Sequence, residues 1–296
     1  MRKPKVSMGK AFQRGVVIVA MIISFFPIFW LVSTSFKPYN EWQEFPPVWV
    51  SSHPTLQNYR VVFFPKAARR YAAKEKGTAD YVVSGSAWKA FGDSLIISTS
   101  ATFFSILFGT LAAYSIVRYK TGGESYPFQF LTVRMFPPIA VVVPMVVLFS
   151  MLRLSDTFLG LILAYTAFTL PFSIWMIRSF IEDAPEELEG AAMIYGMSPL
   201  RAFWKVTFPL IRGGVLATAL FVFILNWSEF LFALTLTTGG VVTVTLQVAN
   251  YVSASSGKLY GVQAAMGTIS TLPVIVFGYL IQRHLVRGLS FGAIKR

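Results

Sequence analysis

The stretch ELEGAAMIYGMSPLRAFWKVTFPL, from Glu187 to Leu210, is a polar segment between two long apolar segments. Gly196 can adopt the left-handed backbone conformation that ends a helix. Ser198 and Pro199 then form a typical helix start, as a cap and a first helical residue. The stretch therefore predicts two helices joined by a glycine bend, outside the lipid core. Apolar residues of the first helix recur at the spacing i, i+3, i+4 and i+7, at Leu188, Ala191, Ala192 and Tyr195.

The start of this first helix suggests what it binds. Asp183 is expected to cap it and Pro185 to lie in its first turn. An amphipathic helix can lie on lipid headgroups, or it can bind a protein. Anionic headgroups repel an acidic helix, and the small residues 190–192 allow another surface to approach closely, so a protein partner is favoured. The acidic residues near its start are Glu182, Glu186, Glu187 and Glu189.

The composition of the whole chain is that of a membrane protein. Of its 296 residues, 55% are hydrophobic, 16% are aromatic and only 13% are charged, and the mean hydropathy is +0.60. Soluble domains carry about 25% charged residues. Apolar segments of the roughly 20 residues needed to cross a bilayer recur along the chain. The sequence therefore predicts one polytopic membrane protein, without a second soluble domain of ordinary size.

Six of these segments are predicted to span the membrane. One of them, about residues 206–236, contains a single acid, Glu229. The predicted fold is all-α, with six transmembrane helices and the polar helix pair in the cytoplasm between the fourth and fifth. Charged residues bracket the other five spans and enclose 18 to 24 uncharged residues each: Arg14 and Lys37, Asp93 and Arg118, Arg134 and Arg153, Asp156 and Arg178, and Lys258 and Arg283.

The chain is accordingly divided into a cytoplasmic N-terminus, a first span, an outer loop, a membrane core with the other five spans and a cytoplasmic tail. These are residues 1–14, 15–36, 37–92, 93–286 (with the helix pair at 182–209) and 287–296.

The net charge of +13 indicates membrane orientation rather than nucleic-acid binding. If the N-terminus is inside, the cytoplasmic segments hold 15 Lys and Arg residues, whereas the two shorter outer loops hold only Arg153 and Lys258. The long outer loop holds eight more, but long loops carry little weight in the positive-inside rule. Both termini are therefore expected to face the cytoplasm, and no nucleic-acid partner is expected.

The polar helix pair resembles the EAA loop of bacterial ABC importer permeases. That loop reads E-A-A, three residues, G, nine residues and I-x-L-P; here the register gives GAA at 190–192, G at 196 and V-x-F-P at 206–209. Gly190 stands where the family has a Glu that is implied to contact the ATPase, and Tyr195 stands where Asp is usual. Residue 189 is a Glu, but one step along a helix is a rotation of about 100°. The Glu189 side chain is therefore expected to point in a different direction from the family Glu at position 190.

The resemblance covers nearly the whole chain and points to the sugar-importer branch typified by the second maltose permease subunit. FGDSLIISTSATFFSILFGTLAAYSIVRYK, residues 91–120, is similar to the second helix of the family, with Asp93 where Asn is usual. Residues 135–181 resemble the third and fourth helices. NWSEFLFALTLT at 226–237 resembles W-N-E-F-L-x-A-L, and QRHLVRGLSFGAIKR at 282–296 resembles the C-terminal signature.

This resemblance implies partners in a bacterial inner membrane: a second permease subunit, two copies of a cytoplasmic ATPase and an extracytoplasmic solute-binding protein, with lipid around them. ATP is expected to bind to the ATPase, since the Gly-Lys pairs at 9–10 and 257–258 lack the other residues of a phosphate-binding loop. The chain itself is expected to have no catalytic residue, cofactor or metal site. The residues implied to couple it to the ATPase are Glu189, Gly190, Ala191, Ala192, Tyr195, Gly196 and Pro209.

The C-terminal tail has two interpretations. On composition it is a frayed basic tail that obeys the positive-inside rule. The resemblance instead implies a tail that reaches between the two ATPases. The residues concerned are Gly292, Ala293, Ile294 and Lys295.

Glu229 also has two interpretations, because an ionisable group in a span is costly unless it is paired or hydrated. It is either a hydrogen-bonding group at a cavity or subunit interface, or an interfacial carboxylate exposed to water. Together with Trp227 and Phe230 it is predicted to lie along the substrate path, since aromatic rings can stack on sugars. His53 and His284 are placed on opposite sides of the membrane and predict no metal site.

A sugar is the expected substrate, with a polyol or a non-sugar solute such as glycerol phosphate as alternatives. A secondary transporter would need coupling-ion acids or broken helices in repeated halves, and one intramembrane acid argues against it. A membrane enzyme would need a catalytic constellation, which the predicted spans do not contain.

Overall fold

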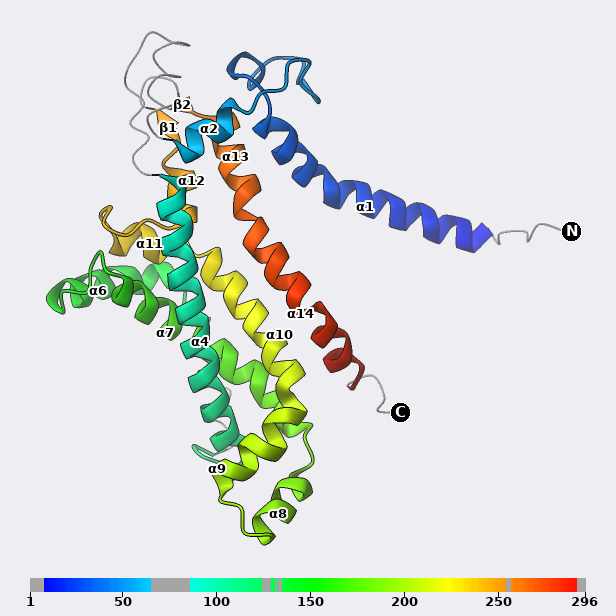
Figure 1. Ribbon diagram of the computed structural model, residues 1–296, viewed down its shortest axis with the longest axis vertical. Helices are drawn as coiled ribbons and strands as arrows, with labels where there is room; N and C mark the ends of the chain where they lie inside the picture. Colours follow the sequence, from blue (N-terminus) through cyan, green and yellow to red (C-terminus); the bar gives the residue numbers. More distant parts are fainter. Residues whose placement is uncertain are drawn as a thin grey trace, which may run out of the picture. The chain divides into compact units, whose positions relative to one another are not determined.

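The computed structural model describes residues 8–64, 86–123, 129–130, 132, 135–253 and 257–291, and helices dominate them (Figure 1). The chain divides into two compact units. The first comprises Met1–Ala87 and Val248–Thr271, and the second comprises Trp88–Gln247 and Leu272–Arg296. The helix pair that resembles an EAA loop belongs to the second unit.

The first unit is built on α1 (Met8–Ser35), α2 (Gln57–Phe63) and α13 (Tyr260–Ser270), and α13 packs against both of the others. Its smaller elements are the 3₁₀ helix η1 (Tyr39–Glu41) and the antiparallel strands β1 (Val252–Ser253) and β2 (Gly257–Lys258).

The segment that follows α1 is held by hydrogen bonds from one side-chain amide and by close packing against one glycine of α13. The buried Asn58 side chain donates to the carbonyls of Ser35 and Lys37, at 2.9 Å each. Gly261 at the start of α13 lies so close to Trp42 that an added Cβ would come within 2.4 Å of the indole nitrogen. Only glycine therefore allows this approach of α13.

The second unit contains the long helices α4 (Ala87–Tyr119), α7 (Phe158–Glu182), α10 (Phe208–Trp227) and α14 (Leu272–Phe291). α10 packs against α7 and α14. The hydroxyls of Ser105 and Thr169 join α4 to α7, 2.7 Å apart. The shorter elements are α6 (Pro138–Met151), α8 (Glu186–Ile194), α9 (Pro199–Ala202), the π-helical turn η2 (Phe203–Thr207), α11 (Leu231–Leu236) and α12 (Val244–Ala249).

The all-α membrane architecture is confirmed, apart from the small β1–β2 hairpin. The third predicted span is α6, a shorter apolar helix of 14 residues that starts at Pro138, directly after Pro137. Among the described residues, five helical segments are long and apolar enough to cross a bilayer: Phe12–Ser35, Ala87–Tyr119, Phe158–Glu182, Pro199–Trp227 and Tyr260–Gln282.

The fifth span differs from the predicted residues 206–236 at both ends. It begins at Pro199, because α9 and η2 continue directly into α10, and its helix ends at Trp227. The carboxylate of Glu229 accepts the backbone N–H groups of Phe232 at 3.1 Å and Ala233 at 3.3 Å. In an unbroken helix these N–H groups would donate to carbonyls of the preceding turn. Because the helix breaks before α11, the Glu229 carboxylate accepts them instead and stabilises the break.

Candidate functional site

The helix pair forms as predicted at its bend and differs at its start. Gly196 has φ +88°. Its N–H donates to the Met193 carbonyl at 2.9 Å, and the Met197 N–H donates to the Ala192 carbonyl at 3.1 Å. The second bond is the six-to-one bond of a Schellman motif. The prediction that Asp183 caps the first helix is wrong: Asp183 ends α7, and Pro185 is the N-cap of α8.

Ala191 of α8 and the motif residues Tyr195 and Gly196 that follow the helix are exposed, whereas Glu189 and Ala192 are buried. The Ile194 and Tyr195 side chains are 87% and 88% exposed, and Ala191 is exposed. Apart from adjacent residues and the nearby backbone of the same helix, no described atom lies within 4 Å of the position that a Cβ would take at Gly190 or at Gly196. Large apolar side chains are also exposed on α8, α9 and η2, at Leu188, Met193, Leu200 and Trp204.

Glu189 faces the opposite way, into its own chain. Its carboxylate accepts hydrogen bonds from the Tyr114 hydroxyl, from Arg118 Nε at 3.1 Å and from the Thr207 hydroxyl at 2.7 Å. The Glu189 side chain is 3% exposed and that of Arg118 is 7% exposed. These four residues are called the Glu189 cluster below. Arg118 also donates to the Ala184 carbonyl at 3.0 Å, in the connection that precedes α8.

The sequence interpretation missed three members of this cluster. Tyr114 and Arg118 lie one turn apart near the end of α4, and Thr207 is the last residue of η2. The i, i+4 spacing of a Tyr and an Arg at the end of a span is compatible with a shared partner, but no local pattern identifies Glu189 as that partner. Ala192 is buried as well, and Pro209 is exposed at the start of α10.

The residues predicted for the substrate path lie at the break between α10 and α11. Trp227 is buried, and its ring neighbours those of Phe91 and Phe223, with centroids 6.1 Å and 5.8 Å away. Glu229 caps α11 through backbone N–H groups, and Phe230 is partly exposed. The tail residues 292–295 lie outside the described residues.

An apolar pocket of about 350 Å³ lies in the second unit, between α4, η2, α10 and α14. Its walls are apolar and aromatic, and the threonines of α4 that line it have hydroxyls that donate to their own helix at Thr99 and Thr110. Trp227, Glu229 and Phe230 do not line this pocket, so it is separate from the predicted substrate path. The lining includes Thr99, Thr102, Phe103, Phe208, Phe223 and Phe277.

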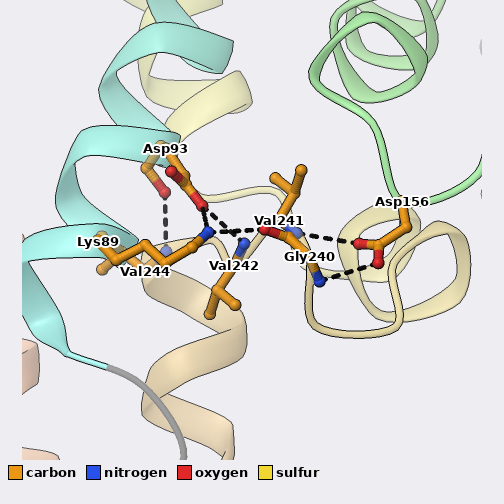
Figure 2. A network of polar contacts seen from close by, with 8 residues as sticks. Lys89, Asp93, Asp156, Gly240, Val241, Val242 and Val244 are labelled. Atoms are coloured by element: carbon orange, nitrogen blue, oxygen red, sulfur yellow. Dashed lines mark hydrogen bonds and ion pairs between the residues drawn. The ribbon is translucent and has the colours of Figure 1, made fainter.

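A second polar network holds the loop of residues 237–243 against the start of α4 and the turn before α7 (Figure 2). Asp93 accepts the Val242 N–H at 3.0 Å and pairs with Lys89, which also donates to the Gly240 carbonyl at 2.7 Å. Asp156 accepts the N–H groups of Gly240 and Val241 at 2.8 and 2.9 Å. The Thr238 hydroxyl donates to Asp156 at 2.8 Å, and the Val244 N–H donates to the Ser94 hydroxyl at 2.8 Å. These contacts are called the 237–243 loop network.

The protonation of Asp156 follows from this geometry. Burial raises the pKa of its carboxyl group, but the hydrogen bonds from Val241, Thr238 and Gly240 lower it by more. The net pKa lies below the ordinary value of 3.8. Asp156 is therefore ionised at neutral pH and accepts all of these bonds as a carboxylate.

Comparison with known families gives the class of this protein. Residues 105–291 match the family described as the binding-protein-dependent transport system inner membrane component. The match covers more than half of the chain, so the protein belongs to that family.

Full-length relatives point to the same class. The chain is 33% identical over 272 residues to a trehalose transport system permease protein of Mycobacterium tuberculosis, covering 91% of this chain and 92% of the relative. It is 31% identical over 284 residues to a trehalose/maltose transport system permease protein of Thermococcus litoralis, covering 95% of each. The protein is a permease subunit of an ABC importer. The family membership that was predicted from the sequence motifs is confirmed.

A solved structure supports the fold. A chain of a bacterial ABC transporter involved in the import of the acidic polysaccharide alginate superposes with a TM-score of 0.71. The alignment covers 95% of this chain and 99% of that one, at 18% sequence identity. At this identity the likeness shows the permease fold.

Proposed function

We propose that this permease forms half of the translocation path for a sugar or related polyol, and that α8 docks onto a cytoplasmic ATPase. In this proposal a second permease subunit completes the path, two ATPase copies bind and hydrolyse ATP, and an extracytoplasmic binding protein delivers the solute. The chain itself holds no nucleotide and catalyses no reaction. Both termini lie in the cytoplasm, and the tail at 292–295 reaches the ATPases.

The observation that carries the docking proposal is the exposed side of α8. Ala191 and Tyr195 lie on it, there is open space beside Gly190 and Gly196, and Ile194 protrudes at its end. A contiguous apolar surface that monomers rarely expose marks an interaction site. The acidic start of α8, with Glu186 and Glu187 exposed, opposes binding to anionic headgroups and favours a protein.

The sugar proposal rests on the relatives, two of which are named for trehalose or for trehalose and maltose transport. A polyol or glycerol phosphate is the competing substrate class. Thermal-shift measurements on the cognate binding protein with trehalose, maltose, sorbitol and glycerol 3-phosphate separate these classes. Stabilisation by glycerol 3-phosphate alone would contradict the sugar assignment.

Docking is tested at Ala191, which is exposed, rather than at Ala192, which packs against its own chain. Ala191→Trp adds bulk to the proposed contact surface, and Ala191→Ser is the matched small change. We expect the ATPase to co-purify in detergent with the Ser variant and to be lost from the Trp variant, while both permeases still insert. Equal retention of the ATPase would mean that this side of α8 lies on lipid instead.

A further inference from the structure

We propose that Glu189 is a positioning residue that fixes α8 to α4 and to the start of α10, so that a displacement of α8 moves both membrane helices. The inference rests on the proposed docking of α8 onto the ATPase. It assigns Glu189 to the transmission of movement within this chain, rather than to the contact with the ATPase.

The hydrogen bonds of Glu189 reach two different long helices. Tyr114 and Arg118 belong to α4, and Thr207 is followed directly by α10. All three side chains donate to one carboxylate, whose oxygens can accept several bonds at once. A single residue of α8 is therefore bonded to the end of one candidate membrane span, Ala87–Tyr119, and to a residue inside another, Pro199–Trp227.

The connections on either side of α8 are short and non-helical, at residues 183–185 and 195–198. Through these connections alone, a nine-residue helix could change its angle without moving its neighbours. The Glu189 cluster removes this freedom in the middle of the helix. Arg118 adds a second point of attachment, because it also holds the Ala184 carbonyl just before α8.

The surroundings of the cluster favour a fixed geometry. The Tyr114 ring packs on Phe203 of η2, with centroids 4.5 Å apart, and both residues belong to an apolar core shared by α4, α7 and α10. In such surroundings hydrogen bonds to a carboxylate are strong, and each partner left unpaired carries a large penalty. The cluster therefore resists partial opening when α8 is pushed.

The anchoring and docking sides of α8 are distinct. Glu189 is buried against its own chain, whereas Glu187, two residues earlier, is exposed. A partner that touches Ala191 and Tyr195 has no access to the Glu189 carboxylate. A change at Glu189 can therefore alter how α8 is held without altering the surface that it presents.

The test measures how firmly α8 is held to α4. The chain contains no cysteine, so spin labels can be placed at Glu187→Cys on α8 and Lys120→Cys just after α4. Distances between the labels are measured by pulsed electron paramagnetic resonance in the purified permease pair, and again with ATPase and ATP–vanadate bound. We expect one narrow distance distribution in this background. Glu189→Ala is expected to lose it and to give a broad or split distribution.

The matched control is Glu186→Gln, an exposed change of charge on the same helix, which should keep the distribution narrow. A second variant, Glu189→Ala with Arg118→Gln, leaves no unpaired buried charge and replaces Glu189→Ala if that variant does not assemble. A distribution as narrow as in the parent would overturn the proposal. Co-purification of the ATPase is measured separately. If the ATPase does not co-purify with the unsubstituted permease, the docking proposal is refuted. The label distances in the permease without ATPase still decide whether Glu189 holds α8.

Discussion

The two polar networks of the second unit stand at opposite ends of one helix and are built in different ways. α4 carries Lys89 and Asp93 near its start and Tyr114 and Arg118 near its end. At 1.5 Å per residue, Asp93 and Tyr114 are about 32 Å apart along the axis. This separation is close to the hydrocarbon thickness of a bilayer, about 30 Å. The separation of the two networks along α4 therefore matches the thickness that a membrane-spanning helix has to cross.

The networks differ in what the carboxylates bind. Glu189 is bonded by three side chains and is almost fully buried, so each partner is specific and its loss leaves a buried charge. Asp93 and Asp156 bind mainly backbone N–H groups of a loop, and Lys89 is 47% exposed. Water can reach Lys89, although the Asp93 side chain is only 10% exposed. The first network fixes helices to each other, and the second one shapes a loop.

The largest effect is expected where this contrast is sharpest, at Arg118. Arg118→Ala leaves the Glu189 carboxylate buried without its counter-charge, and such a change typically costs about 3–5 kcal/mol. The thermal midpoint of the permease in detergent should fall strongly, together with its yield in membranes.

The control for Arg118 is a pair of the same type on the surface. Arg178 and Glu182 are 2.7 Å apart and both substantially exposed, and exposed pairs contribute about 0–1 kcal/mol. Arg178→Ala should therefore leave the midpoint almost unchanged. If the two Arg variants lost equal stability, burial would not be what distinguishes the Glu189 cluster.

A smaller effect is expected at Asp156. Asp156→Ala removes the acceptor for three donors of the 237–243 loop, at about 1–3 kcal/mol for hydrogen bonds to a charged group. The measurement is amide hydrogen exchange of residues 237–243, which should become faster. Asp156→Asn retains one acceptor oxygen and should give an intermediate rate. Unchanged exchange in the Ala variant would show that Asp93 and Ser94 hold the loop alone.

The same network predicts a pH dependence. The folded-state pKa of Asp156 lies below the ordinary value of 3.8. Its contribution to the stability of the loop is therefore complete above about pH 4 and is lost as the pH falls through the folded-state pKa. Exchange of the 237–243 loop should accelerate in that acidic window in the parent protein, and should do so less in Asp156→Asn. A loop that loosened as the pH rose from 5 to 8 would contradict this assignment.

Next in size is the bend of the helix pair. Gly196 is in the left-handed region with open space around it, so a side chain there meets a conformational cost rather than a clash. Gly196→Val should cost about 1–2 kcal/mol and lower the retention of the ATPase in detergent. Gly196→Asn, which tolerates this conformation, is the matched control. Equal retention by both variants would separate the bend from docking.

The sequence predicted those parts of the fold that local rules determine. Apolar segments between charges gave the membrane helices, and a glycine followed by Ser-Pro gave the bend at Gly196. Helix ends set by tertiary contacts were predicted less well. The continuation of α10 back to Pro199 and the break stabilised by Glu229 depend on neighbours that a sequence pattern does not contain.

The same limit applies to the candidate site. The motif placed Ala191 and Tyr195 on an exposed helix, because helical spacing and family resemblance agree there. It also grouped Glu189 with them, whereas the structure turns that carboxylate inward. Its partners Tyr114 and Thr207 lie 75 and 18 residues away in the chain. A contact of such sequence separation cannot be found from periodicity.

The smallest effect is expected at Gly190, where the contrast between docking and anchoring can be sharpened most. Gly190→Glu restores the residue usual in the family. Apart from adjacent residues and the helix's own backbone, no described atom lies within 4 Å of the new Cβ. Replacing glycine inside a helix stabilises it by about 0.5 kcal/mol. The permease should fold as before, and its retention of the ATPase in detergent should be equal or higher.

Gly190→Gln is the control, because it adds the same bulk and helix preference without the charge. Tighter retention by Glu alone would identify a charged contact beside the Glu189 cluster. Loss of the ATPase from both variants would show that the docking surface requires a residue without a side chain at this position. The expectation that this chain tolerates the family residue would then be wrong.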